Sequence, residues 1–288
     1  MRIGFIDYYL DNWHANYYPG FLRSAALKFG YDIDICSAYA VTDKPGGVTT
    51  RQWCEERQIK PARSMSEVID ESDALMVIAA DDSRFHDFVC PQALKSGKPV
   101  FVDKTFAKDV KTAMEFFKIA SAHNTPVFSA SAQRYCQSII DYAAEPNRNT
   151  RFMSTAGPHS LANYAVHQLE PIIAVMGVGV KRVKCFSVGL MVTNLLLDYM
   201  DGRLASFVQS PQPWAEFNFL VSDGENGRRL PSDENNFYEN LMRAILEFFK
   251  TGISPVAPEE TLEVLAIIEI AEKYRDKFDT WIDMREIM

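Results

Sequence analysis

Two residues of this sequence, Lys104 and His167, stand where acid–base chemistry is expected. Lys104 follows the apolar run PVFVD, residues 99–103, which predicts a buried strand, and binding groups collect at the carboxyl ends of parallel strands. His167 has Asn163 four residues before it, so both side chains would share one helix face. A histidine exchanges protons near neutral pH, and a lysine stabilises a developing alkoxide. The alternatives are a solvated lysine and a histidine that is simply hydrogen-bonded on a helix face.

Other kinds of catalytic site have little support. His159 and His167 lack metal-ligand spacing, and no H-E-x-x-H motif accompanies them, so no metal site is expected. No G-x-S-x-G nucleophile elbow is present. The five cysteines are scattered and never form a C-x-x-C pair, so we expect reduced residues in or near the core. They are Cys36, Cys54, Cys90, Cys136 and Cys185.

The elements that would position the candidate residues alternate between strand and helix over residues 1–129. Short apolar runs predict strands, and periodic apolar residues between them predict helices. The predicted strands are residues 2–6, 31–39, 74–80, 98–104 and 125–131. The predicted helices are one ending at Gly30, residues 51–57 and 66–71, one ending near Gly97, and one with an apolar stripe at Val110, Ala113, Met114 and Phe117. This alternation predicts an α/β fold with a Rossmann-like, doubly wound parallel sheet.

The pattern changes in residues 130–288. Strand candidates at 180–190, 191–200 and 204–210 follow one another without helices between them, which predicts an antiparallel sheet. Asp201-Gly202 is a hairpin signal between the last two. Two helices follow, one stopping at Gly252 and one beginning at Pro258. We therefore expect a second, α+β domain.

Composition narrows the class of protein. With 47% hydrophobic and 24% charged residues, the sequence is that of a globular protein with a sizeable core. A net charge of -8 and a pI near 5.2 argue against nucleic acid or an anionic membrane as the main partner. No apolar run has the length of a spanning helix and no signal segment is visible, so we expect a cytoplasmic protein.

Several segments together resemble the Gfo/Idh/MocA family, the glucose–fructose oxidoreductase and inositol dehydrogenase group, over nearly the whole chain. Residues 72–128 are similar in order and spacing to that family's T-P-N-x-x-H turn, A-x-x-x-G-K-x-V strand and E-K-P-x-A segment. Residues 157–177 resemble its G-G-x-x-x-D-x-G-x-H-x-x-D segment, and residues 239–275 its closing helix pair. The resemblance implies a Rossmann domain followed by an open-faced antiparallel sheet.

The resemblance also implies catalytic roles. His86 falls on the family's turn histidine, Lys104 on the lysine of E-K-P, and His167 on the histidine of the second motif. By this comparison His167 is the acid/base and Lys104 is its electrostatic and proton-relay partner.

Four further residues match positions that the family uses for its substrate. Asn163 and Glu170 fall on the two aspartates of the second motif, and Asn163 is expected to hydrogen-bond the substrate. Arg134 and Tyr135 follow the last Rossmann strand, where the family places substrate contacts. An asparagine cannot ionise near neutral pH, so a role that needs the first aspartate's charge is not retained.

The implied activity is NAD- or NADP-dependent hydride transfer to or from a sugar, cyclitol or related polyol. Residues 1–129 would bind the dinucleotide, and residues 130–288 would bind substrate and mediate oligomerisation. An open apolar sheet face needs cover, so a homo-oligomer, a dimer or tetramer, is expected.

The glycines of the dinucleotide motif are missing. Placing G-x-G-x-x-G on the loop after the first strand puts Asp7, Tyr9 and Asn12 at the glycine positions. Side chains there oppose the close approach of a diphosphate, and Asp7 and Asp11 bring negative charge to a helix end that attracts anions.

Other positions depart from the family as well. Asp82 replaces the proline of T-P-N, Asp103-Lys104-Thr105 replaces E-K-P, and Ser37 stands nearest the usual ribose-binding acid. We predict that a cofactor, bound in a rearranged mode, would meet Asp7, Tyr9, Asn12, His14, Ser37, Asp82 and His86. The alternative is a catalytically silent homologue that binds a small molecule or assembles with a partner.

Overall fold

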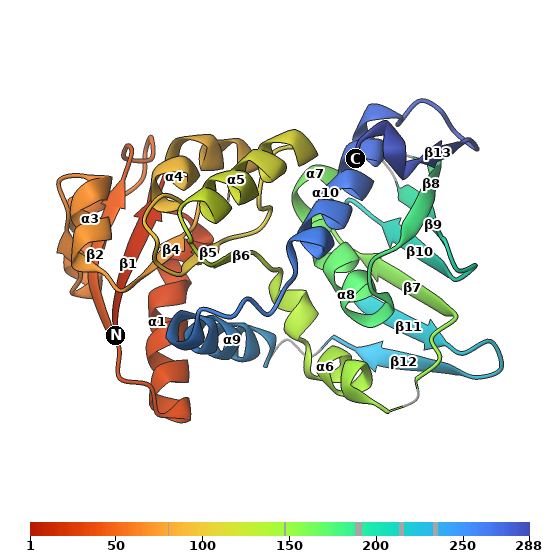
Figure 1. The fold of residues 1–288 in the computed structure, drawn as a ribbon, viewed down its shortest axis with the longest axis horizontal. Helices are drawn as coiled ribbons and strands as arrows, with labels where there is room; N and C mark the ends of the chain where they lie inside the picture. Colours follow the sequence, from red (N-terminus) through yellow and green to blue (C-terminus); the bar gives the residue numbers. More distant parts are fainter. Residues whose placement is uncertain (80, 147, 188–191, 213–215, 233–235) are drawn as a thin grey trace. The chain divides into compact units, whose positions relative to one another are not determined.

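The computed structural model describes residues 1–288 except 80, 147, 188–191, 213–215 and 233–235. The chain forms two compact units (Figure 1). The first contains Met1–Ala130 and Leu241–Pro258, and the second contains Ser131–Asn240 and Glu259–Met288. The division falls inside helix α9 (Phe237–Thr251). The roles given above to residues 1–129 and 130–288 stay predictions.

The first unit is built on a sheet of six described strands, all paired in parallel. The strand order is β3-β2-β1-β4-β5-β6, which reverses direction between β1 and β4 as a doubly wound sheet does. The predicted Rossmann-like sheet is therefore confirmed. Its strands are β1 (Arg2–Asp7), β2 (Asp34–Ala40), β3 (Lys60–Pro61), β4 (Ala74–Val77), β5 (Val100–Val102) and β6 (Val127–Phe128).

Helices connect these strands, as the alternating pattern predicted. Helix α1 (Trp13–Phe29) ends at Gly30, which has a left-handed φ of 74°. It begins well before its apolar stripe because Asn12 caps it, with its side-chain oxygen accepting from the Ala15 N–H. The others are α2 (Thr50–Arg57), α3 (Met65–Glu71), the 3-10 helix η1 (Ser83–Phe85), α4 (His86–Ala93) and α5 (Val110–Ala122).

The buried face of α5 differs from the predicted one. Val110 and Ala113 are buried as expected, but Met114 is 53% exposed and Phe116 is buried in its place. The prediction for Met114 was wrong because the spacing of apolar residues fits two adjacent faces. Phe106 packs against both faces, edge-on to Phe116 with ring centroids 5.8 Å apart and stacked on Phe117 at 4.6 Å.

The second unit is built on a sheet of seven described strands in the order β12-β11-β7-β10-β9-β8-β13. The predicted antiparallel pairing is confirmed for β8, β9 and β10. The sheet is nevertheless mixed, because β7, which has no counterpart among the predicted strands, pairs parallel with β10. Residues 188–191, the adjoining ends of two predicted strands, lie outside the described residues. The strands are β7 (Phe152–Gly157), β8 (Val180–Ser187), β9 (Thr193–Tyr199), β10 (Leu204–Gln209), β11 (Asn218–Ser222), β12 (Gly227–Pro231) and β13 (Trp281–Asp283).

Helices of the second unit pack on this sheet, and α8 lies against β7 and β10 (Figure 1). The predicted hairpin at Asp201-Gly202 joins β9 to β10, with Gly202 at a φ of 83°. No helix in the described part of the chain is long and apolar enough to cross a membrane. The helices are the 3-10 helix η2 (Ala132–Tyr135), α6 (Gln137–Ala144), α7 (Leu161–Tyr164), α8 (Val166–Met176), α10 (Pro258–Lys273) and the 3-10 helix η3 (Met284–Glu286).

Candidate functional site

The loop after β1 is closed by the carboxylate of Asp7. Its oxygens accept hydrogen bonds from the backbone N–H groups of Tyr8 (2.7 Å) and Ala79 (3.0 Å) and from the Asn12 amide (2.8 Å). A dinucleotide's diphosphate uses backbone donors at this place in a Rossmann sheet. The Asp7 side chain thus takes one backbone donor of this loop, the Tyr8 N–H, together with the Ala79 N–H after β4.

Burial raises the pKa of Asp7 from 3.8 to about 7, although the hydrogen bonds from Asn12, Tyr8 and Ala79 favour the ionised form. The free-energy cost of removing the carboxylate charge from water is larger than the stabilisation that these hydrogen bonds give the charge. Near neutral pH this carboxyl therefore changes between a charged and a neutral group.

His14 and Asp103 form a buried pair at the same edge of the sheet. His14 lies in the first turn of α1, and its Nδ1 is bonded to a carboxylate oxygen of Asp103, which directly follows β5 and is fully buried. The Tyr18 hydroxyl donates to the other oxygen at 3.3 Å. Burial would raise the pKa of Asp103, but attraction to His14, the His14 hydrogen bond and the Lys104 charge outweigh it and hold the pKa below its ordinary value. Asp103 is therefore ionised at neutral pH.

Aromatic rings form a packed cluster beside the β1 loop. The rings of Tyr8 and Phe85 stack with centroids 4.1 Å apart and an angle of 3° between their planes. The Tyr9 hydroxyl donates to Asp81 at 2.9 Å, and the Lys44 ammonium lies 5.0 Å from the Tyr9 ring centre. Burial and the Asp81 bond raise the pKa of Tyr9, so its hydroxyl stays protonated. These rings therefore pack mainly on one another, since Tyr8 also meets Phe88 and Phe85 also meets Tyr9.

Three residues predicted to meet a cofactor have other contacts in the structure. His86 is fully buried, with its ring nitrogens 2.9 Å from the Ile78 carbonyl and 3.1 Å from the Thr105 carbonyl. Ser37 is buried three residues before the end of β2, so its position argues against a ribose contact. Asp82 caps η1 and pairs with Arg84, and the Arg84 hydrogen bond lowers its pKa.

In the second unit, Ser131 orients His167. The Ser131 hydroxyl lies 2.6 Å from Nδ1 of His167, near the start of α8. The Tyr164 ring meets the imidazole edge-on, with centroids 5.0 Å apart. Asn163 is exposed on the short helix α7, which breaks from α8 at Ala165. Ser131 and Tyr164 therefore hold the imidazole ring of the candidate acid/base in one orientation.

Arg134, Glu170 and Glu260 form a buried network in the second unit. One Arg134 nitrogen donates to Glu170 at 3.1 Å, and another donates to Glu260. Burial raises the pKa of Glu170 to about 7, against the opposing effect of Arg134. Tyr135, next to Arg134, has a buried hydroxyl with no hydrogen-bond partner among the described residues. Arg134 and Glu170 were predicted to bind substrate. In the structure they form an ion pair with each other, and Arg134 also pairs with Glu260.

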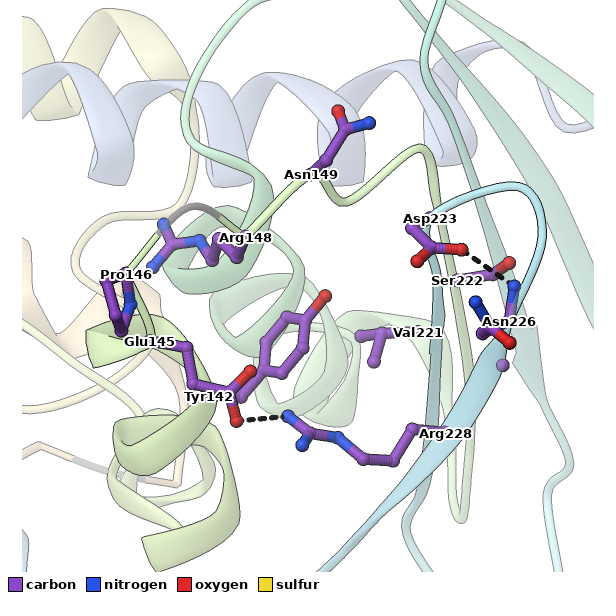
Figure 2. A pocket seen from close by; sticks show the side chains of 11 residues that line it. Tyr142, Glu145, Pro146, Arg148, Asn149, Val221, Ser222, Asp223, Asn226 and Arg228 are labelled. Atoms are coloured by element: carbon purple, nitrogen blue, oxygen red, sulfur yellow. Dashed lines mark hydrogen bonds and ion pairs between the residues drawn. The ribbon is translucent and has the colours of Figure 1, made fainter.

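A polar hollow of about 340 Å³ lies between α6 and the β11–β12 hairpin (Figure 2). Its charges are paired within its wall: Glu145 bonds to Arg228 at 2.6 Å, and Asp223 accepts from the Asn226 N–H at 2.7 Å. None of the predicted site residues lines it. Among the described residues there is also no cluster of side chains suited to a metal ion.

Comparison with solved structures places this arrangement among known folds. No model of a known protein family and no curated protein matches the sequence. A probable dehydrogenase from Thermotoga maritima superposes with a TM-score of 0.83 at 14% identity, covering 100% of both chains. The chain has the Gfo/Idh/MocA fold.

Two further solved structures share this fold. An oxidoreductase from Agrobacterium radiobacter in complex with NAD+, L-tartaric acid and magnesium has a TM-score of 0.80 at 12% identity, covering 100% of this chain and 99% of that one. An apo scyllo-inositol dehydrogenase from Lactobacillus casei has a TM-score of 0.78 at 13% identity, covering 99% and 98%. At these identities, the Gfo/Idh/MocA fold is what the likeness shows.

A nicotinamide dinucleotide does not fit the first unit in the glycine-loop mode, because the Asp7 carboxylate accepts from the Tyr8 N–H of this loop and from the Ala79 N–H after β4. The groups that remain for a rearranged mode are polar. The His14–Asp103 pair and Lys104, which comes two residues after β5, have the chemistry to meet hydroxyl or phosphate groups.

Two residues of this Gfo/Idh/MocA fold were not singled out as site residues from the sequence. Asp103 was noted only as a departure from E-K-P, and Ser131 was not considered. Asp103 directly follows β5, and Ser131 comes three residues after the end of β6, so both lie in segments that leave the carboxyl ends of strands, where sites collect. A systematic reading of the polar residues after each strand would have included them.

Proposed function

We propose that this protein is an oxidoreductase that uses NAD or NADP to oxidise a hydroxyl carbon, or reduce a carbonyl, of a sugar-like polyol. The observation that carries the proposal is the fold shared over the full chain with dehydrogenases, combined with a His167 ring held by Ser131. The nicotinamide would supply or accept the hydride. His167 would exchange the proton of the substrate hydroxyl, and Lys104, directly after β5, would stabilise the alkoxide.

A second candidate is a catalytically silent homologue that binds a small molecule or assembles with a partner. Asp7 favours it, because a buried carboxylate in the β1 loop opposes a diphosphate both sterically and by charge. The two candidates differ in whether a nicotinamide binds at all.

The experiment that separates them starts with calorimetric titration of the purified protein with NAD, NADH, NADP and NADPH. The oxidoreductase should bind one of them at micromolar levels, about -8 kcal/mol. A polyol screen then identifies a substrate, and Lys104→Ala and His167→Ala should each lower kcat at least about 10²-fold while the fold is retained. Lys118→Ala and His123→Ala change exposed residues of the same types and serve as controls. No binding up to millimolar nicotinamide, or unchanged turnover in both site variants, contradicts the proposal.

We also propose that the protein is a homo-oligomer that uses the face of the second sheet opposite α8. Apolar side chains lie exposed there, including Phe186 (47%) and Leu220 (44%). Sedimentation of a monomer at working concentration would count against this proposal.

A further inference from the structure

The His14–Asp103 pair has the geometry of an activated imidazole. Asp103 is ionised and can only accept hydrogen bonds, so the proton between the two residues belongs to Nδ1 of His14. A neutral imidazole with its proton on Nδ1 carries a lone pair on Nε2. Asp103 therefore selects the tautomer in which Nε2 accepts a proton.

Neighbouring rings hold this imidazole in place. Tyr18 stacks on it with centroids 4.8 Å apart and planes 15° apart, and Trp13 meets it edge-on at 5.2 Å. Tyr18 also donates to Asp103, so the ring and its carboxylate share one support. A base whose partner and ring plane are both fixed needs little reorganisation when it takes a proton.

The second nitrogen of His14 remains available. Its Nε2 has no hydrogen bond to any residue in the described part of the chain, and 12% of the side chain is exposed. His86, at the same edge, provides the contrast: both of its nitrogens face backbone carbonyls, and it is fully buried. Of these two histidines, only His14 has a ring nitrogen that could take a proton from a bound molecule.

We infer that His14 and Asp103 form a proton-transfer dyad at the carboxyl edge of the first unit's sheet, acting on a hydroxyl of the molecule bound there. The O–H bond of that hydroxyl breaks, and the oxygen keeps the electron pair. The proton bonds to Nε2, and the resulting imidazolium still donates through Nδ1 to Asp103 before it releases the proton to water. This inference rests on the proposed function and adds a second proton-handling residue, in the other unit from His167.

The first test needs no cofactor and uses diethyl pyrocarbonate, a small reagent that modifies the unprotonated nitrogen of histidine. Modification of each of the five histidines is followed by peptide mass spectrometry. In Asp103→Asn, the amide can donate to Nδ1 and so move the ring proton to Nε2, which should slow modification of His14 at least about 5-fold relative to wild type. Exposed His123 reports equal reagent dose, and Asp87→Asn, at the exposed pair with Lys108, is the matched control. Equal His14 rates in wild type and Asp103→Asn overturn the dyad.

The second test measures turnover. His14→Ala should lower kcat roughly 10²-fold with the KM for the nicotinamide little changed, and added imidazole should restore part of kcat. His123→Ala should behave as wild type. A change confined to KM, or no rescue by imidazole in a folded variant, shows that His14 only binds or packs and overturns the inference. If wild type binds no nicotinamide and turns over no polyol, the proposed function fails, and the modification experiment alone decides the dyad.

Discussion

Replacing Arg134 with leucine is expected to lower the free energy of unfolding by about 3–5 kcal/mol. The Arg134 side chain is only 12% exposed, and it bonds two carboxylates whose side chains are 4% (Glu170) and 22% (Glu260) exposed. Its loss leaves the buried Glu170 carboxylate without its arginine, which costs more than the pair contributes when intact. Urea unfolding followed by circular dichroism at pH 8 measures the change.

Two further variants test whether the loss of stability comes from burial of the ion-pair network. Arg285→Leu removes an arginine of similar geometry from a pair with Asp283, but that arginine side chain is 89% exposed, so stability should be nearly unchanged. Adding Glu170→Met to Arg134→Leu removes the carboxylate that has lost its arginine and should recover part of the loss. Equal stability of Arg134→Leu and wild type would show that the network is not a structural one, and would return Arg134 to the list of substrate contacts.

The second large effect concerns pH and Asp7. Because its pKa is raised from 3.8 to about 7 on folding, the folded state binds this proton more tightly than the unfolded chain does. The associated stability is fully present below pH 3.8, is lost as the pH rises, and is gone above about pH 7. The loss from this group amounts to roughly 4 kcal/mol. Glu170, also raised to about 7, adds a fall in the same direction.

Asp7→Asn should flatten this dependence, because an amide does not titrate. The free energy of unfolding is measured in urea at several pH values between 4.5 and 8 for wild type and variant. Asp223→Asn changes an exposed aspartate that backbone N–H groups of a turn hold, and it should keep the fall between pH 4.5 and 7. Parallel curves for Asp7→Asn and wild type would mean that Asp7 is not the titrating group.

Much of the fold could be predicted because it depends on local pattern. The run ALMV at Ala74–Val77 is apolar at every position, as a strand covered on both faces must be, and it forms β4. Gly30 and Gly252 mark helix ends because both adopt left-handed φ angles that other residues avoid. The parallel pairing of β7 with β10 escaped prediction, since pairing depends on where distant segments meet and not on the residues of either strand.

The sequence by itself determined the order of strands and helices, the absence of a glycine motif after β1, and the presence of Lys104 and His167. Only the tertiary structure decided which groups act together. Asp7 meets the Ala79 N–H across 72 residues, His14 meets Asp103 across 89, and Arg134 meets Glu260 across 126. Apolar periodicity records whether a residue is buried, whereas the partner of a buried polar group is set by packing of segments far apart in the chain. That packing brought the Ala79 N–H to the Asp7 carboxylate, which the sequence showed only as a missing glycine, and it paired His14 with a buried carboxylate.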